Sequence, residues 1–263
     1  HLTNAARQIP IYQAMGWDIP AFAHQSLIHG PDGAKLSKRH GALAVEAYRD
    51  MGYLPEGMRN YLLRLGWSHG DDEIIPTDKA IEWFNLESIG KAPARFDFDK
   101  LNFVNAHYIK ESDDSALLAL ILPIIEAQYG ARPTEDETSR LMRGLSELKQ
   151  RSKTLLELTD NIKYLLLKRP LSVSDKAQKQ LGEEARSMLA NLYQTLEESD
   201  VWTPEGLESL IRTFVDTNGL KFGQVGQPLR AALTGGAKSP GIFDVLNALG
   251  RDESLARIKD QLT

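Results

Sequence analysis

The stretch RLMRGLSELKQRSKTLLELTDNIKYLLL, residues 140–167, decides the fold class. Its apolar residues recur every three or four positions, which is the spacing of one face of an α-helix. The same pattern runs through LLALILPIIEAQYG (117–130), SDKAQKQLGEEARSMLANLYQTL (174–196), TPEGLESLIRTFVDTNG (203–219) and GIFDVLNALG (241–250). Almost nothing after Ser115 alternates with period two. The sequence therefore predicts a domain of six to nine helices, with N-caps at Ser174, Thr203 and Asp252.

The first third of the chain mixes helical patterns with turns. The predicted helices are TNAARQIPIYQAMG (3–16), GYLPEGMRNYLLRLGW (52–67), in which Pro55 occupies the first turn, and FDFDKLNFVNAHYIK (96–110), capped by Asp97 or Asp99. FAHQSLIHGPDGAKL (22–36) predicts a hairpin or a strand that leads into a loop. We expect a domain boundary near Lys110–Ser115 and a weaker one near Asp200–Thr203.

The composition excludes several classes of site. With no cysteine among its 263 residues, the chain cannot form a disulfide, a cysteine zinc site or a thiol nucleophile, which is consistent with a cytosolic protein. The longest apolar run, Leu117–Ile125, is interrupted by Pro123 and is far shorter than the roughly 20 residues of a membrane helix. No signal peptide is visible. Because the chain opens on His1, without an initiator Met, we expect a piece of a longer polypeptide.

Charge is unevenly distributed along the helical region. The net charge of −5 gives no global signal for nucleic acid. Locally, residues 111–139 hold seven acids and one base, whereas residues 140–176 hold nine Lys or Arg and four acids. This switch favours one basic face on an acidic body, and on charge alone a solvated helix face accounts for it equally well.

AKLSKRHG, residues 34–41, places three cations within five residues: Lys35, Lys38 and Arg39. A loop with glycine on either side can close over a triphosphate and supply cations where negative charge develops as pyrophosphate leaves. On spacing alone, a solvated basic turn is the commoner explanation. The neighbouring sequence must decide between the two.

That neighbouring sequence resembles a known family. KLSKR resembles the KMSKS signature loop of class I aminoacyl-tRNA synthetases, in the form that glutamyl-tRNA synthetases use. The flanking blocks are similar too: HLTNAARQIPIYQAMGW, YRDMGYLPEGMRNYLLRLGWS, FDFDKLNFVNAHYI, and, far downstream, LKFGQVGQPLRAALTG and SPGIFDVLNALG. The resemblance runs from His1 nearly to the end of the chain.

The resemblance implies a mainly α fold in three parts. Residues 1–34 would be a remnant of the α/β, Rossmann-like catalytic half, residues 35–112 the KMSKS-type loop and stem-contact region, and residues 113–263 an all-helical anticodon-binding domain that could divide near 200–203. The family's HIGH signature is absent. The chain therefore resembles the C-terminal portion of a glutamate–tRNA ligase, and by itself it should not activate glutamate.

The resemblance also implies ligands and partners. Full-length enzymes of the family use ATP with Mg²⁺ to make glutamyl-adenylate and then pass the acyl group to the tRNA. ATP and L-glutamate would bind only with the missing N-terminal half, so the expected partner of this portion is tRNA(Glu). The implied setting is a cytoplasmic monomer. No metal site is expected, because His24, His29, His40 and His69 lack metal spacing with carboxylates.

Site residues follow from matching the family motifs position by position. The ATP-binding loop would comprise Lys35, Leu36, Ser37, Lys38 and Arg39, with Lys38 as the ATP contact. The anticodon site would comprise Arg151, which would read the third anticodon base, and Arg230, Ser239, Pro240 and Ile242. Phosphates of the tRNA would be held by Lys149, Lys153, Lys163 and Arg212.

Alternatives differ in how they treat the same residues. A non-catalytic helical RNA-binding module without an enzymatic parent would make KLSKR incidental and Arg151 an ordinary surface arginine. A glutaminyl-tRNA synthetase reads the anticodon with β-barrels, which the helical pattern after Ser115 contradicts, and a shortened tRNA-modifying relative lacks the helical domain. The sequence leaves open whether Arg151 makes recognition strict for glutamate tRNA.

Overall fold

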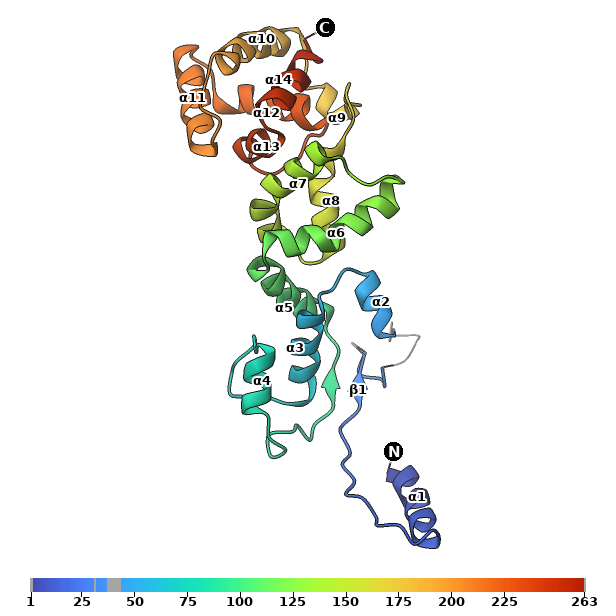
Figure 1. The fold of residues 1–263 in the computed structure, drawn as a ribbon. Helices are drawn as coiled ribbons and strands as arrows, with labels where there is room; N and C mark the ends of the chain where they lie inside the picture. Colours follow the sequence, from blue (N-terminus) through green and yellow to red (C-terminus); the bar gives the residue numbers. More distant parts are fainter. Residues whose placement is uncertain (1, 31, 37–43, 263) are drawn as a thin grey trace. The chain divides into compact units, whose positions relative to one another are not determined.

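Helices dominate the computed structural model, which describes residues 2–30, 32–36 and 44–262 (Figure 1). The expected mainly α fold class is therefore confirmed. The chain forms two compact units, His1–Asn105 and Ala106–Thr263. Within the described ranges, no helix combines the length and the apolar character needed to cross a bilayer.

The first unit contains short helices and a small parallel sheet. Its elements are α1 (Leu2–Ala14), β1 (Ile28–His29), α2 (Val45–Asp50), α3 (Pro55–Gly66), α4 (Thr77–Trp83), β2 (Ala94–Arg95) and the start of α5 (Phe98–Glu111). In the sheet, Ile28 pairs with Ala94 and His29 pairs with Arg95. As predicted, α3 has proline in its first turn.

The core of the first unit is aromatic and lies between α2, α3 and the start of α5. Its buried members are Tyr48, Tyr53, Met58, Tyr61, Phe96 and Leu101. The Tyr61 hydroxyl accepts a hydrogen bond from the Asp97 amide at 2.6 Å, and burial raises the pKa of Tyr61 to about 12. Of the two expected caps of α5, Asp97 is used, because its Oδ1 accepts from the amides of Asp99 and Lys100.

The segment that leads into KLSKR is a strand followed by a tight turn. The amide of Gly30 donates to the carbonyl of Ala34 at 2.8 Å, and the amide of Leu36 donates back to the carbonyl of Ile28 at 2.9 Å. Both predicted features are present. A single antiparallel bridge between His29 and Lys35 forms a short hairpin, and β1 itself pairs with the distant strand β2. Leu36 packs against the aromatic core.

The second unit contains helices joined by loops, with no strand among its described residues. Its α-helices are α6 (Asp114–Tyr129), α7 (Glu135–Leu148), α8 (Leu155–Ile162), α9 (Asp175–Gln178), α10 (Glu183–Glu197), α11 (Pro204–Thr217), α12 (Phe222–Thr234), α13 (Ile242–Leu249) and α14 (Arg251–Lys259). Two 3₁₀ turns, η2 (Lys149–Arg151) and η3 (Lys163–Leu166), flank α8. Helix α13 packs on α7, and α10 packs on α12 and α14, as Figure 1 shows.

Side-chain caps define most of these helix starts. The predicted caps Ser174 and Thr203 are confirmed, since each hydroxyl accepts from a backbone amide in the first turn. The predicted cap Asp252 is wrong, because α14 begins at Arg251, directly after Gly250. Gly250 has a φ of 81°, a conformation that glycine adopts at low cost. The chain turns there from α13 into α14 without any spacer in which Asp252 could act as a cap.

Candidate nucleic-acid interface

A cavity of about 500 Å³ opens in the second unit between two stretches that are distant in sequence. The first wall comprises lining residues from the end of α7 to just beyond η3: Leu148, Arg151, Glu157, Asp160, Asn161, Lys163, Tyr164 and Leu167. The second wall follows the end of α12 and comprises Thr234, Gly236, Lys238, Ser239 and Pro240. Both walls therefore carry residues that the sequence singled out.

Arg151 lies on the first wall, where the chain leaves η2. The backbone of Ser152 is extended, and its hydroxyl donates to the Leu148 carbonyl at 2.9 Å while accepting from the Asn161 amide group at 3.1 Å. This local network fixes the bend that carries Arg151. The guanidinium is 52% exposed and pairs with Glu147 at 2.7 Å.

Lys163 adds a second cation to the first wall. Its ammonium pairs with Asp160 at 2.7 Å, and this hydrogen bond raises the pKa of Lys163. Below it, Tyr164 is buried. Burial raises the pKa of Tyr164, and the carboxylate of Asp244 adds to the rise, so the phenol remains neutral at physiological pH.

The second wall is built around a helix end and a serine. Helix α12 ends at Gly235, whose φ is 65° and whose amide donates to the Ala231 carbonyl. One helical turn earlier, the Arg230 Nε donates to the Ser239 Oγ at 2.8 Å. That hydroxyl in turn donates to the Pro240 carbonyl at 2.9 Å. Arg230 thus sets the position of Ser239 at the cavity edge.

These walls offer the chemistry of recognition. Donors include guanidinium, ammonium, amide and hydroxyl groups, and the carboxylates of Glu157 and Asp160 provide acceptors. Unstacked RNA bases are commonly read by edge hydrogen bonds and stacking. Over the residues described, no group of three or more His, Asp or Glu could hold a metal ion.

Other expected site residues lie outside the cavity lining. Ile242 is buried at the first position of α13. The Lys149 ammonium is only 14% exposed and is bound by Asp114 at 2.7 Å and by the Ser112 carbonyl at 2.8 Å. Lys153 is exposed near the bend. Arg212, on α11, pairs with Glu208 and lies 5.5 Å from the ring centre of Phe222.

The cations of residues 140–176 do not share one face. Arg151 and Lys163 line the cavity, whereas Arg140, Arg143 and Arg169 contact groups on α13 and α14 or just after α14. The expectation of a single basic face is therefore replaced by two separate clusters. The partners of these three arginines lie 91 to 113 residues away in the sequence, so local charge patterning could not reveal the second cluster.

Sequence reasoning missed several lining residues. Lys238 sits within the turn-rich string GGAKSPG (235–241), directly before two expected site residues, and this neighbourhood was a usable signal. Thr234 and Asn161 carried no comparable signal. They line the cavity because they lie at the ends of α12 and α8. The helical periodicity and the composition of the sequence do not specify where those helices end.

Of the signature loop, the structure describes Lys35 and Leu36. Lys35 is exposed and pairs with His29 in a single antiparallel bridge. Ser37, Lys38 and Arg39, including the expected ATP contact, lie outside the described residues.

Comparison with known proteins now identifies the family. Residues 113–262 match the family model of an anticodon binding domain, and residues 1–103 match the catalytic domain of class I tRNA synthetases for E and Q. Glutamate–tRNA ligase 2 of Parvibaculum lavamentivorans is 56% identical over 261 residues, which cover 99% of this chain and 53% of that protein. This chain belongs to the glutamate–tRNA ligase family.

Further members of that family are similar to this chain over nearly its whole length. Glutamate–tRNA ligase 2 of Rhodospirillum centenum is 56% identical, over 99% of this chain and 56% of its own length. A crystal structure of a glutamate tRNA ligase from Elizabethkingia meningosepticum, in complex with its amino acid, superposes with a TM-score of 0.81 at 30% identity. The alignment covers 99% of this chain and 55% of that one. The chain thus spans about half the length of the relatives it matches, and the family resemblance drawn from KLSKR and its flanking blocks is confirmed.

Proposed function

We propose that this chain is the tRNA-binding, C-terminal part of a glutamate–tRNA ligase, and that the cavity of the second unit reads the anticodon of tRNA(Glu). The observation that carries the proposal is the meeting of Arg151 and Ser239 at one cavity, with Arg230 holding Ser239. Arg151 and Ser239 are 88 residues apart in sequence, and nothing in the helical period requires them to meet.

Arg151 is suited to reading a base. A guanidinium presents a rigid fork of donors to a base edge, and a good bidentate pair discriminates by about 1–3 kcal/mol. Its present partner, Glu147, is an exposed i,i+4 carboxylate, and such pairs contribute only about 0.3–0.5 kcal/mol. The guanidinium can therefore exchange Glu147 for a nucleobase at little cost.

The remaining residues play supporting roles in the proposal. Ser239 and Pro240 offer a hydroxyl and an apolar ring to the other anticodon bases, and buried Ile242 supports them from the start of α13. Lys153, Lys163 and Arg212 hold phosphates without reading sequence. Lys149 is left out, because Asp114 and Ser112 already take its ammonium.

Upstream, the KLSKR segment would serve ATP in the full-length enzyme. Exposed Lys35 is suited to a phosphate as a compact point charge, and Lys38 is proposed as the ATP contact with Ser37 and Arg39 beside it. Magnesium would accompany ATP, although the described residues of this chain offer no cluster that fits the ion. Glutamate activation would require the rest of the enzyme, so this chain alone should show no ATP–pyrophosphate exchange with glutamate and tRNA. The proposal places the enzyme in the cytoplasm as a monomer, with domains divided at 34/35 and 112/113.

The test compares two RNAs on the 263-residue chain by filter binding at one salt concentration, because phosphate contacts make affinity depend on salt. One RNA is a tRNA(Glu) transcript and the other carries a changed third anticodon base. The unmodified chain should prefer the intact anticodon. Arg151→Gln should reduce that preference by about 5- to 150-fold, which corresponds to 1–3 kcal/mol of lost base discrimination.

Arg212→Gln is the matched control. Arg212 is also an exposed arginine in an i,i+4 pair with a glutamate, but it lies outside the cavity. Its loss should weaken the binding of both RNAs equally and lower the slope of affinity against salt concentration by about the value of one phosphate contact. Equal binding of the two RNAs by the unmodified chain, or an unchanged preference in Arg151→Gln, would refute the proposed reading of the anticodon.

A further inference from the structure

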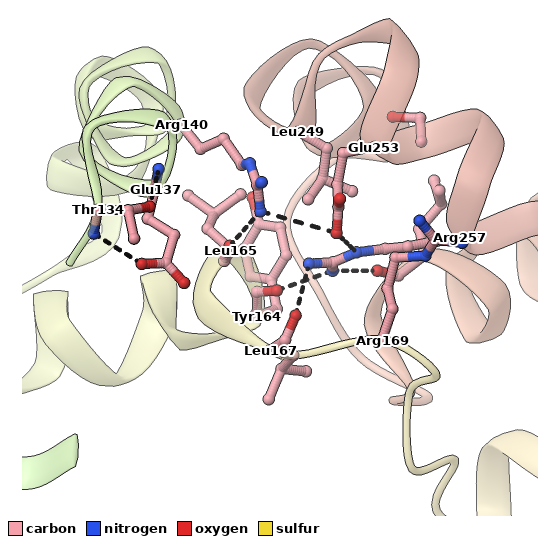
Figure 2. A network of polar contacts seen from close by, with 12 residues as sticks. Thr134, Glu137, Arg140, Tyr164, Leu165, Leu167, Arg169, Leu249, Glu253 and Arg257 are labelled. Carbon is pink, nitrogen blue, oxygen red and sulfur yellow. Dashed lines mark hydrogen bonds and ion pairs between the residues drawn. The ribbon is translucent and has the colours of Figure 1, made fainter. Parts of the chain in front are cut away.

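A buried arginine on α14 binds backbone groups from both walls of the cavity. Arg257 is fully buried. Its Nη1 donates to the carbonyls of Tyr164 and Leu233, each at 2.8 Å, and its Nη2 donates to the Leu167 carbonyl at 3.1 Å. Figure 2 shows this guanidinium between η3 and α14.

Two of the three carbonyls belong to the first wall, and the third belongs to the residue that leads into the second. Tyr164 and Leu167 line the first wall, and Leu233 directly precedes Thr234, the first residue of the second wall. A single nitrogen, Nη1, therefore bridges the two walls through two hydrogen bonds of equal length. If the Tyr164 and Leu233 carbonyls moved apart, at least one of these two hydrogen bonds would lengthen.

The surrounding charges hold this guanidinium in place. Glu253 accepts from the Arg257 Nε at 2.7 Å and lies 3.7 Å from the Arg140 Nη1. Arg140 also donates to the Leu165 carbonyl (Figure 2). The carbonyls at the end of a helix lack intrahelical partners, and Arg140 and Arg257 together bind three carbonyls around the end of η3, those of Tyr164, Leu165 and Leu167.

Arginine is the residue type that this geometry requires. Its planar fork carries five donors in fixed directions, and the hydrogen bonds of Arg257 to Glu253 and to the three carbonyls use four of them. A lysine at the same position would offer three donors on one nitrogen, which cannot reach the Tyr164, Leu233 and Leu167 carbonyls and also Glu253 in this arrangement. Because Arg257 is fully buried, it acts on any ligand only through the walls.

We propose that Arg257 is a positioning residue that fixes the spacing of the two walls and thereby sets how well the cavity distinguishes one nucleobase from another. The inference rests on the proposed anticodon-reading function of the cavity. It adds a determinant of selectivity that makes no contact with RNA.

The test uses Arg257→Lys in the 263-residue chain with the same two RNAs, at a temperature well below the measured unfolding midpoint. The preference for the intact anticodon should fall by about tenfold, the lower end of the 10–100-fold losses seen when supporting partners of metal ligands are removed. The salt dependence should not change, because no phosphate contact is lost. If the role of Arg257 were merely structural, the variant would contain a smaller fraction of folded, binding-competent protein. The apparent affinity for both RNAs would then fall by the same factor, and the preference would stay unchanged.

Arg143→Lys is the matched control, because Arg143 also donates to carbonyls, those of Ala248 and Leu249, which are outside the cavity lining. It should destabilise the unit and keep the preference. If Arg257→Lys does not fold, Glu253→Gln replaces it and should also lower the preference.

The possible outcomes separate the two proposals. If Arg151→Gln lowers the preference while a folded Arg257 or Glu253 variant keeps it, only the positioning inference is wrong. If neither of these variants folds, Arg257 maintains the whole unit and does not tune one site, and the inference fails. If the unmodified chain shows no preference, the inference falls together with the proposed function.

Discussion

At the scale of single residues, the first wall is anchored by an ion pair just beyond its end. The Arg169 Nε and Nη2 donate to the two carboxylate oxygens of Asp260, each at 2.8 Å. This hydrogen-bonded cation holds the pKa of Asp260 below its ordinary value. The pair ties the chain after η3 to the end of α14.

Asp260→Asn should lower the free energy of unfolding by about 1 kcal/mol at pH 7, because a charge-assisted, partly exposed bidentate pair is lost. The native pKa is depressed, so the stabilisation is fully present above about pH 4, the ordinary aspartate value, and is lost as the pH falls through the native pKa. Urea unfolding at pH 7 measures the loss of stability in the variant, and urea unfolding at pH 2.5 measures how far that loss disappears in acid.

Asp200→Asn, in the exposed connection between α10 and α11, is the control and should have little effect at either pH. A difference between Asp260→Asn and the unmodified chain that stayed constant down to pH 2.5 would contradict the assigned role of Arg169.

Candidate site residues could be named from the sequence only where a motif carried them. Arg151, Arg230 and Ser239 were named by resemblance; in the structure Arg151 and Ser239 line one cavity, and Arg230 donates to Ser239 from outside its lining. Lys149 looked the same in sequence as its neighbours. Its burial depends on Asp114, which lies 35 residues away, and no local pattern contains that information.

At the scale of elements, α7 supports the first wall and begins with a capping box (Figure 2). The Thr134 hydroxyl accepts from the Glu137 amide at 3.3 Å, and the Glu137 carboxylate accepts from the Thr134 amide at 2.8 Å. The two groups satisfy two donors that the helix itself leaves unpaired.

Thr134→Ala should therefore reduce the free energy of unfolding by about 1 kcal/mol, the usual value of an N-cap. Thr134→Ser should retain most of this stability, because serine keeps the hydroxyl that accepts the hydrogen bond. Urea unfolding followed by circular dichroism distinguishes the two. Equal loss in both variants would show that the methyl group, and not the cap, is responsible.

Period and caps predicted the helices but not their interruptions. The pattern of residues 140–167 continues through the bend at Ser152, because Leu155 and Leu158 resume the apolar spacing beyond it. The break arises from a competing cap, Thr154, whose hydroxyl accepts from the Glu157 amide at 3.1 Å. That break is what brings Arg151 to the cavity.

At the scale of the whole molecule, the second unit has its own buried core. Leu145 on α7 is fully buried, as are Leu189 on α10, Leu229 on α12 and Val245 on α13. A unit with its own hydrophobic core can in principle fold alone.

A polypeptide of residues 112–263 should therefore unfold in one cooperative, helical transition and keep the anticodon preference. Starting at Ser112 retains Asp113, whose carboxylate accepts from the amides of Ser115 and Ala116 and so caps α6. Thermal denaturation followed at 222 nm, together with the same filter-binding comparison, checks both points. A broad, non-cooperative melt would place part of the needed core in residues before Ser112, which include Ala106–Glu111 of the second unit.

Gly235, at the end of α12, has a consequence for how this family can diverge. A Cβ at this position would lie 2.6 Å from the carbonyl oxygen of Ser172, and the Gly235 carbonyl already accepts from the Ser174 amide at 2.9 Å. Any other residue would need both a left-handed backbone and room that the chain occupies. A substitution at this position should therefore be poorly tolerated whatever residues stand around the turn, because main-chain crowding, and not contact with RNA, sets the requirement for glycine.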